Sequence, residues 1–280
     1  QDLVQQRSYL EDPGGALSIT DIQRAQGWQS FTGPLPLRNK GTPFWVRLQV
    51  QPPPAGDWVV RVQPGLLQDI QVFQRTAHGA WEVQRLGSSH AYQARERVEL
   101  AFSVLLHSPP GEAATVFVRV RSDSAIAHFK VISAQDSQEF DIRTHVLVGL
   151  YTGFSVVVMC ISLLGWRVTG QRLWLLNAGF DFTTFVMVGL QMGLFAKYLL
   201  PASQGVLDQA IFYANSIHFA LACLLFREML RLFHVPAWCT WAYTACIGLL
   251  PVQLLLIGLG HGAKAMALNN LGMLCISLWG

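Results

Sequence analysis

The first half of the sequence contains no cysteine. The five cysteines of the 280 residues all lie in the second half, at Cys160, Cys223, Cys239, Cys246 and Cys275. A disulfide framework therefore cannot hold the first half together, even in an oxidising compartment. About 140 residues can form an ordinary hydrophobic core without such cross-links. We expect one self-supporting domain there, and we expect the cysteines to act as small apolar packing residues.

The first half also lacks a surplus of basic residues. Residues 1–144 contain 14 Lys and Arg against 14 Asp and Glu, and the remaining residues contain 6 against 3, which accounts for the formal net charge of +3. A domain without net positive charge offers little electrostatic attraction to phosphate groups. Nucleic acid is therefore excluded as an expected partner.

Motifs for catalysis and for cofactor or metal binding are missing as well. The sequence has no Ser/His/Asp order, nucleophile elbow or glycine-rich phosphate loop. The histidines of the first half lack the spacing of metal ligands and are read as surface residues: His78, His90, His107 and His128. The sequence thus predicts no catalytic residue, no cofactor and no metal site, and it predicts that this chain is not an enzyme.

Long uncharged runs dominate the second half. Val146–Trp166 has 21 residues without charge and ends at Arg167. At 1.5 Å per residue it reaches roughly 32 Å, enough to cross the hydrocarbon core of a bilayer. Further apolar runs lie at about 173–196, 205–226, 236–260 and 265–280. We expect five spans with the last one truncated, a helix start at Pro236 and a kink at Pro251.

The short loops between these runs predict the orientation. Lys and Arg favour the cytoplasmic side of a membrane. Two loops carry arginine pairs and the others offer single lysines: Arg167 with Arg172 and Arg227 with Arg231, against Lys197 and Lys264. The arginine loops are therefore predicted to be cytoplasmic and residues 1–144 to lie outside. A signal peptide removed before Gln1 is expected for this orientation.

Short runs of alternating residues fill the first half. In Phe44–Val50, Phe44, Val46, Leu48 and Val50 share one face and the intervening residues share the other. Similar runs are Trp58–Gln63, Asp69–Gln74, Ala80–Leu86, Val98–Leu105, Thr115–Arg121 and His128–Ile132. Their spacing predicts an all-β antiparallel sandwich of the jelly-roll kind. A short strand at Leu17–Ile19 and a helix from Asp21 to Ala25, capped by Thr20, are expected before them.

The less apolar faces of these strands mix aromatic rings with hydrogen-bond donors. The candidate ligand-binding residues are Trp45, Arg47, Arg61, Asp69, Phe117, Arg119 and Arg121, with Gln49, Gln63, Gln71 and Phe73 beside them. A flat apolar ring and a forked guanidinium suit a sugar or a small anion. The alternative is that these are ordinary solvent-facing residues paired across strands.

Polar residues within the apolar runs need partners inside the membrane. Asp181 and His218 would lie at similar depth in neighbouring antiparallel helices, with Asn177 and Asn215 one turn away. Hydrogen bonding between helices, a conformational or proton-linked switch, and transport chemistry are the three readings of this set. Gly149 and Gly153 have the spacing at which a neighbouring helix packs closely.

Several short motifs in fixed order resemble a bacterial family, the seven-transmembrane receptors with diverse intracellular signalling modules, in the form with a type 2 extracellular domain. The motifs are Leu10-Glu11-Asp12-Pro13 with Leu17-Ser18-Ile19, Gly41 with Phe44-Trp45-Val46-Arg47, Pro64 with Asp69-Ile70-Gln71-Val72-Phe73, Phe117-Val118-Arg119-Val120, Gly149-Leu150-Tyr151-Thr152-Gly153, Gly189 with Gly193-Leu194-Phe195 and Leu200-Pro201, and Phe226-Arg227-Glu228-Met229-Leu230. The resemblance covers essentially the whole chain, which differs from the family in having about five spans and no output module.

The resemblance implies a periplasmic jelly-roll sensor domain at 1–132, a connector at 133–145 and a transmembrane helical domain at 146–280 in the bacterial inner membrane. It implies a carbohydrate or other small ligand, a homodimer, and a cytoplasmic diguanylate cyclase or histidine kinase as output. A transporter or transport accessory protein with a carbohydrate-binding domain is the alternative, and a structural envelope protein is a third hypothesis.

Overall fold

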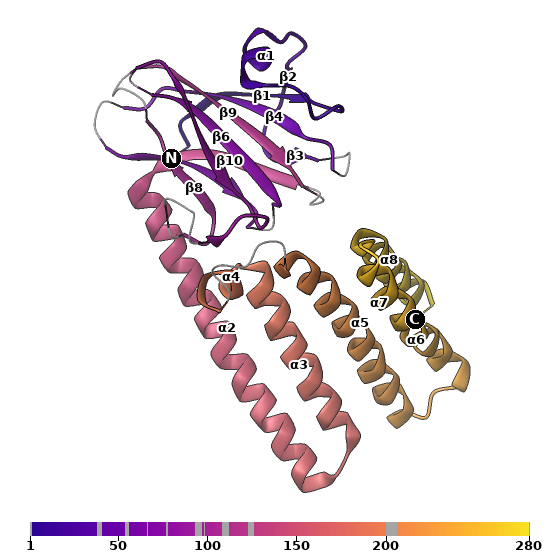
Figure 1. The fold of residues 1–280 in the computed structure, drawn as a ribbon. Coiled ribbons are helices and arrows are strands. Elements are labelled where there is room, and N and C mark those ends of the chain that lie inside the picture. The colour runs from indigo at the N-terminus through magenta and orange to yellow at the C-terminus, as the bar shows by residue number, and fades with distance from the viewer. Residues whose placement is uncertain are drawn as a thin grey trace. The chain divides into compact units, whose positions relative to one another are not determined.

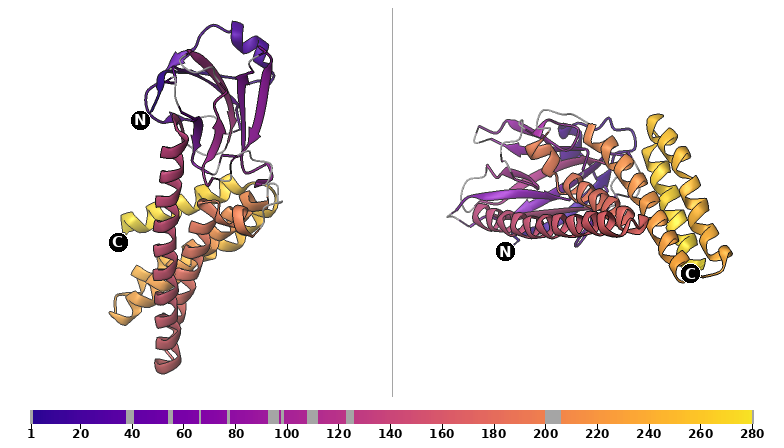
Figure 2. Two further views of the ribbon diagram at one scale, coloured as in Figure 1. Left: turned by 90° about the vertical axis from the view of Figure 1, so that its left-hand side faces the viewer. Right: turned by 90° about the horizontal axis from the view of Figure 1, so that it is seen from below.

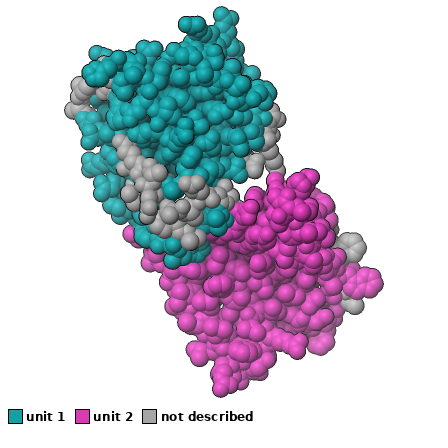
Figure 3. Space-filling model, in the orientation of Figure 1, with its two compact units in different colours: residues 1–145, 192–207 teal, residues 146–191, 208–280 magenta. Residues whose placement is uncertain are grey.

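The computed structural model describes residues 2–37, 41–53, 56–65, 67–76, 78–92, 97, 99–107, 112–122, 126–199 and 206–279. Predicted features at Val98, Leu200, Pro201, Gly205 and Gly280 lie outside these residues, as does the side chain of Cys239. The chain divides into two compact units, residues 1–145 with 192–207 and residues 146–191 with 208–280 (Figure 3). The strands belong to the first unit and most of the helical residues to the second.

The strands of the first unit form two antiparallel sheets (Figures 1 and 2). The six-stranded sheet has the order β2 (Gln29–Ser30), β1 (Val4–Glu11), β4 (Phe44–Val50), β9 (Ala114–Arg121), β6 (Asp69–Arg75) and β7 (Trp81–Leu86). The four-stranded sheet has the order β3 (Leu35–Pro36), β10 (Ile126–Ser133), β5 (Trp58–Gln63) and β8 (Phe102–Leu105). Neighbours in both sheets are often far apart in sequence, as a sandwich with crossing connections requires.

One hydrophobic core fills the space between the two sheets. Phe44, Val46, Leu48 and Val50 of β4 all belong to it, together with β5 residues such as Val60. The alternation of β4 thus places every second side chain in the core, because successive side chains of a strand point to opposite faces. The predicted antiparallel sandwich followed by a helical membrane segment is confirmed.

The first helix begins earlier than the sequence pattern indicated. α1 runs from Ile19 to Arg24, and its N-cap is Ser18 rather than Thr20. Ser18 and Asp21 form a reciprocal capping box, which satisfies two backbone N–H groups. The predicted strand at Leu17–Ile19 is wrong, because Ile19 already belongs to the helix. Strands β1, β2 and β3 were not predicted: β1 is largely polar, and β2 and β3 have two residues each.

The helices are α2 (Ala134–Thr169), α3 (Arg172–Gln191), α4 (Leu194–Tyr198), α5 (Val206–Leu232), α6 (Ala237–Gly248), α7 (Leu250–Gly258) and α8 (Gly262–Trp279). Four segments of the described chain are long and apolar enough to cross a membrane: Ala134–Thr169, Arg172–Gln191, Gln209–Leu232 and Thr240–Gly258. The fifth expected span corresponds to α8, which does not belong to these four.

Two of the expected spans are interrupted. The run expected at 173–196 ends as α3 at Gln191, and Gly193 adopts a left-handed conformation with φ +72° before α4. The run at 236–260 is divided at Leu249 into α6 and α7. Pro236 caps α6 and Pro251 lies in the first turn of α7, so the predicted helix start and kink are confirmed. Proline has no N–H to donate to the preceding turn.

Candidate functional site

The outer face of the six-stranded sheet gathers most of the predicted ligand-binding residues. Trp45 pairs with Arg119 in register, Arg47 with Phe117, and Asp69 with Arg121. These pairs share one face because cross-strand partners point the same way. Arg61 does not join them, since it lies on β5 of the other sheet. The prediction of a shared face therefore holds for the residues of β4, β6 and β9.

The rings on this face are mostly covered. Trp45 and Phe117 are 1% and 6% exposed, and they pack with Phe73 and Ile22 of α1 in a second small core. The Trp45 indole N–H donates to the carboxylate of Asp12 at 3.4 Å. Trp45 therefore belongs to this small core and does not offer a free ring on which a ligand could stack. Its burial is caused by α1, which lies over the face that the alternation pattern marked as exposed.

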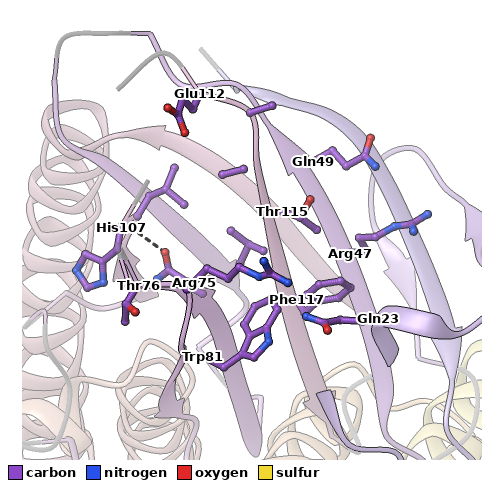
Figure 4. A pocket seen from close by; sticks show the side chains of 16 residues that line it. Gln23, Arg47, Gln49, Arg75, Thr76, Trp81, His107, Glu112, Thr115 and Phe117 are labelled. Carbon is purple, nitrogen blue, oxygen red and sulfur yellow. Dashed lines mark hydrogen bonds between the residues drawn. The ribbon is translucent and has the colours of Figure 1, made fainter. Parts of the chain in front are cut away.

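A pocket of about 660 Å³ opens on the same face (Figure 4). Figure 4 shows Arg75, Trp81, Phe117 and Gln23 close together, with Glu112 at the opposite end. The other labelled side chains that line it are Arg47, Gln49, Thr76, His107 and Thr115. These residues come from α1, from four strands of the six-stranded sheet and from the loops around His107 and Glu112. Rings, amides and guanidinium groups thus converge on one concave surface, as in small-molecule sites.

The two arginines of the pocket are held against tryptophan rings. The Arg47 guanidinium carbon lies 4.6 Å from the centre of the Trp28 ring, and the Arg47 Nε donates to the Ser8 hydroxyl at 3.1 Å. The Arg75 guanidinium carbon lies 5.2 Å from the centre of the Trp81 ring. Such cation–π contacts fix the position of a guanidinium and leave its outward N–H groups free to bind a ligand.

Two other predicted residues are held by partners of their own. The Arg119 Nη2 donates to the Gly15 carbonyl at 3.0 Å. Asp69 accepts from Gln71 at 3.4 Å and lies 3.0 Å from the His90 ring nitrogen. Neither residue lines the pocket, and each is bound by partners within the protein on the interior strands β9 and β6.

Arg61 forms a buried polar cluster at the start of α2. Its side chain is 4% exposed, and its Nη2 donates to Asp141 of α2 at 2.6 Å. Its Nη1 donates at 2.7 Å to the Ser137 hydroxyl, which in turn donates to Glu99 at 2.8 Å. The second Asp141 oxygen accepts from the backbone N–H of Leu100 at 3.0 Å. Arg61 is thus a residue that fastens α2 to the sandwich.

Opposing effects act on the Glu99 carboxylate in this cluster. Burial alone would raise the pKa of Glu99, but hydrogen bonds from Ser137 and Arg97 and the charge of Arg97 lower that pKa below its ordinary value of 4.5. The cluster therefore favours the charged form of Glu99, which has donors in Ser137 and Arg97. A buried ion pair that is fully hydrogen-bonded is costly to break by removing one partner.

The intramembrane residues pair differently from the prediction. In the described chain, no hydrogen bond or ion pair joins Asp181 to His218. Asn177 donates to Asp181 at 3.2 Å and to Ser162 of α2 at 2.9 Å, which joins α2 to α3. His218 lies 3.1 Å from the Thr183 hydroxyl and stacks on Phe180. Of the three readings, hydrogen bonding between helices describes these contacts, whereas Asn215 has no hydrogen bond to another described residue.

The two predicted packing glycines have open space beside them in the part of the chain that the structure describes. A Cβ atom added at Gly149 or Gly153 would meet no described heavy atom within 4 Å. Close helix packing instead occurs at Gly165, where an added Cβ would approach the Trp174 ring to 2.7 Å.

Several pocket residues were not predicted as site residues from the sequence: Gln23, Arg75, Trp81, His107, Glu112 and Thr115. Arg75 and Thr115 could have been found, because they continue the alternation that places Phe73 and Phe117 on the outer face. Gln23, His107 and Glu112 lie on a helix and on loops. Strand periodicity carries no information about which loop approaches which strand.

Comparison with known proteins supports this architecture. Residues 5–132 match the family model described as 7TMR-DISM extracellular 2. The N-terminal domain belongs to this family. The 7TMR-DISM extracellular 2 domain therefore comprises both sheets, the pocket and the β5 side of the buried cluster. No curated protein matches the chain.

The family and the helices together indicate the class of the protein. A 7TMR-DISM extracellular 2 domain followed by four candidate membrane spans indicates a transmembrane receptor with an extracellular N-terminal domain. The resemblance to the type 2 extracellular domain of this family is confirmed for residues 5–132.

Proposed function

We propose that this chain is the sensing and membrane part of a bacterial inner-membrane receptor. A small ligand, carbohydrate-like in shape, binds the periplasmic 7TMR-DISM extracellular 2 domain. The membrane helices then regulate a cytoplasmic diguanylate cyclase or histidine kinase, and the receptor acts as a homodimer. Carbohydrate binding is supported by the pocket, where Trp81 offers a ring beside amide and guanidinium donors.

The observation that carries the proposal is the continuity of α2. This helix begins at Ala134, is held to the sandwich by Arg61 through Ser137 and Asp141, and continues without a break to Thr169. A helix with intact backbone hydrogen bonds is stiff over this length. A movement of the sandwich at Arg61 would therefore pull on the start of α2, and the helix would transmit this movement to the first membrane span.

A short strand connects the pocket with the buried cluster. Gln74 of β6, which lines the pocket, donates to the Leu105 carbonyl at 2.8 Å and accepts from the His107 N–H at 2.9 Å. Both partners lie at the end of β8, whose beginning follows Glu99 and Leu100 of the cluster. A ligand that moves His107 or Gln74 would act on β8, and β8 would act on α2.

Asp141→Asn tests this route in membranes that contain the natural receptor. The variant keeps the shape of the side chain but removes the charge that pairs with Arg61. We expect the response of the output, measured as cyclic di-GMP formation and as autophosphorylation, to fall at least tenfold. Arg143→Gln is the matched control, because Arg143 forms an exposed ion pair with Glu139 on the same helix. An equal response in Asp141→Asn and Arg143→Gln would refute the route.

A transport accessory role is the second candidate, and two buried amides favour it. Gln253 and Asn269 are 1% and 3% exposed, and amide atoms of both have no hydrogen-bond partner among the described residues. Water or a polar substrate in the bundle would satisfy them. Labelling of Gln253→Cys by a water-soluble maleimide would support transport, and protection from the reagent would argue against it.

A further inference from the structure

We infer that the pocket selects an acidic ligand, a saccharide that carries a carboxylate, as uronic-acid sugars do. This inference rests on the proposed ligand-binding function and adds the charge of the ligand. It comes from the two arginines of the pocket and from what surrounds them.

Some of the described arginines of the first unit form ion pairs with carboxylates. Arginines with a carboxylate partner are Arg7 with Asp2, Arg61 with Asp141, Arg97 with Glu99 and Arg143 with Glu139. Arg47 and Arg75 belong to the remaining arginines, since neither forms an ion pair with a described carboxylate, and their place at the pocket distinguishes them. Both line the pocket, where Glu112 is the one acidic residue among the described lining residues. The pocket therefore has an excess of positive charge in a domain whose sequence carries no net charge.

The two guanidinium groups are also positioned in advance. Each lies against a tryptophan ring, and Arg47 is tied to Ser8 as well. A guanidinium fork matches the two oxygens of a carboxylate, and pre-positioning reduces the entropy lost on binding. Unpaired arginines on an open surface normally move freely, so the stacking of both at one pocket is the feature that indicates an anion.

The rest of the pocket suits a sugar ring more than a simple ion. Phe117 packs between Trp28 and Trp81, with ring centres 6.0 Å and 5.7 Å apart, and Trp81 is partly exposed. This gives an apolar surface for the C–H face of a pyranose ring. Gln23, Gln49 and Thr115 add neutral donors and acceptors for hydroxyl groups.

Calorimetric titration of the 280-residue chain in lipid nanodiscs tests the inference with three probes. Digalacturonate has both rings and carboxylates, maltose has rings without charge, and malonate has carboxylates without a ring. We expect digalacturonate to bind at least tenfold more tightly than either of the others. Binding of maltose as tight as that of digalacturonate would overturn the inference, and so would the absence of digalacturonate binding up to millimolar concentration.

Variants separate the pocket from general surface charge. The double substitution Arg47→Gln and Arg75→Gln should weaken digalacturonate binding at least tenfold, whereas Arg85→Gln should not. Arg85 is the control because it lies on β7 of the same sheet but does not line the pocket. Arg75→Lys, which keeps the charge but not the fork, should give an intermediate loss. Unchanged affinity in the double variant, with an unchanged unfolding temperature, would overturn the inference.

The result is independent of signalling. Digalacturonate binding that leaves the output unchanged would refute the receptor function and leave the binding site standing. If the output depends on Asp141 but the receptor does not bind digalacturonate, the acidic-ligand inference is refuted and the receptor function stands.

Discussion

Glu99 makes the stability of the sandwich depend on pH. Because its pKa is lower in the folded state than its ordinary value, the folded state favours the charged carboxylate. This stabilisation is complete above about pH 4.5 and is lost as the pH falls through the folded-state pKa. We expect the unfolding temperature to be nearly constant at neutral pH and to decline on acidification below that value.

Thermal unfolding of the chain between pH 3 and pH 7 would measure this effect. Glu99→Gln should be less stable than the wild type at neutral pH and should show a smaller acid-induced decline. An identical pH profile for the two proteins would show that Glu99 does not contribute.

Gly87 is a second position at which one side chain decides stability. Its φ of +121° is a conformation that residues with a Cβ rarely adopt, and an added Cβ would overlap the Gln68 carbonyl. Gly87→Ala should cost about 1–3 kcal/mol of strain or more and lower the unfolding temperature. Gly14→Ala is the control, because an added Cβ meets nothing within 4 Å there. Equal unfolding temperatures would contradict the prediction.

At the scale of elements, the α2–α3 hairpin is joined at Gly165 and at Ser162. The Trp174 ring packs on Gly165, and Asn177 donates to Ser162. Gly165→Ala should push the ring away, because its Cβ would lie 2.7 Å from that ring. Overpacking of this kind costs about 1–3 kcal/mol, so the hairpin should unfold at lower denaturant concentration.

Gly153→Ala provides the comparison on the same helix, since it adds a methyl group where no described atom lies within 4 Å. Denaturation followed by tryptophan fluorescence in mixed micelles would measure both variants. If Gly165→Ala and Gly153→Ala unfold alike, the Trp174 contact is not important for the hairpin.

At the scale of the whole molecule, the receptor proposal requires α2 to act as one rigid helix. Two alanines inserted between His145 and Val146 rotate the first span by about 200° relative to the buried cluster, and four rotate it by about 400°, or 40° net. We expect two insertions to abolish ligand-dependent output in the natural receptor and four to restore much of it. The same assays of cyclic di-GMP and autophosphorylation apply. A loss that grows steadily with insert length would indicate a flexible connection.

Much of this architecture was predictable from the sequence, because strands and membrane spans leave periodic or continuous apolar patterns. The alternation of Phe44–Val50 placed its core face correctly, and the uncharged run from Val146 to Trp166 marked the first span. Local periodicity reports the environment along one element only.

Tertiary structure decided the roles of the polar and aromatic residues. The alternation of β4 predicted that Trp45 lies on the exposed face of the sheet. It could not predict that α1 covers this residue. Arg61 was predicted to bind a ligand, but in the folded chain it binds Asp141, which is 80 residues away in the sequence. The sequence determined the sandwich, the apolar helices and the family. The pairing of charges between distant segments decided which arginine fastens α2, because contacts between segments depend on the folded chain.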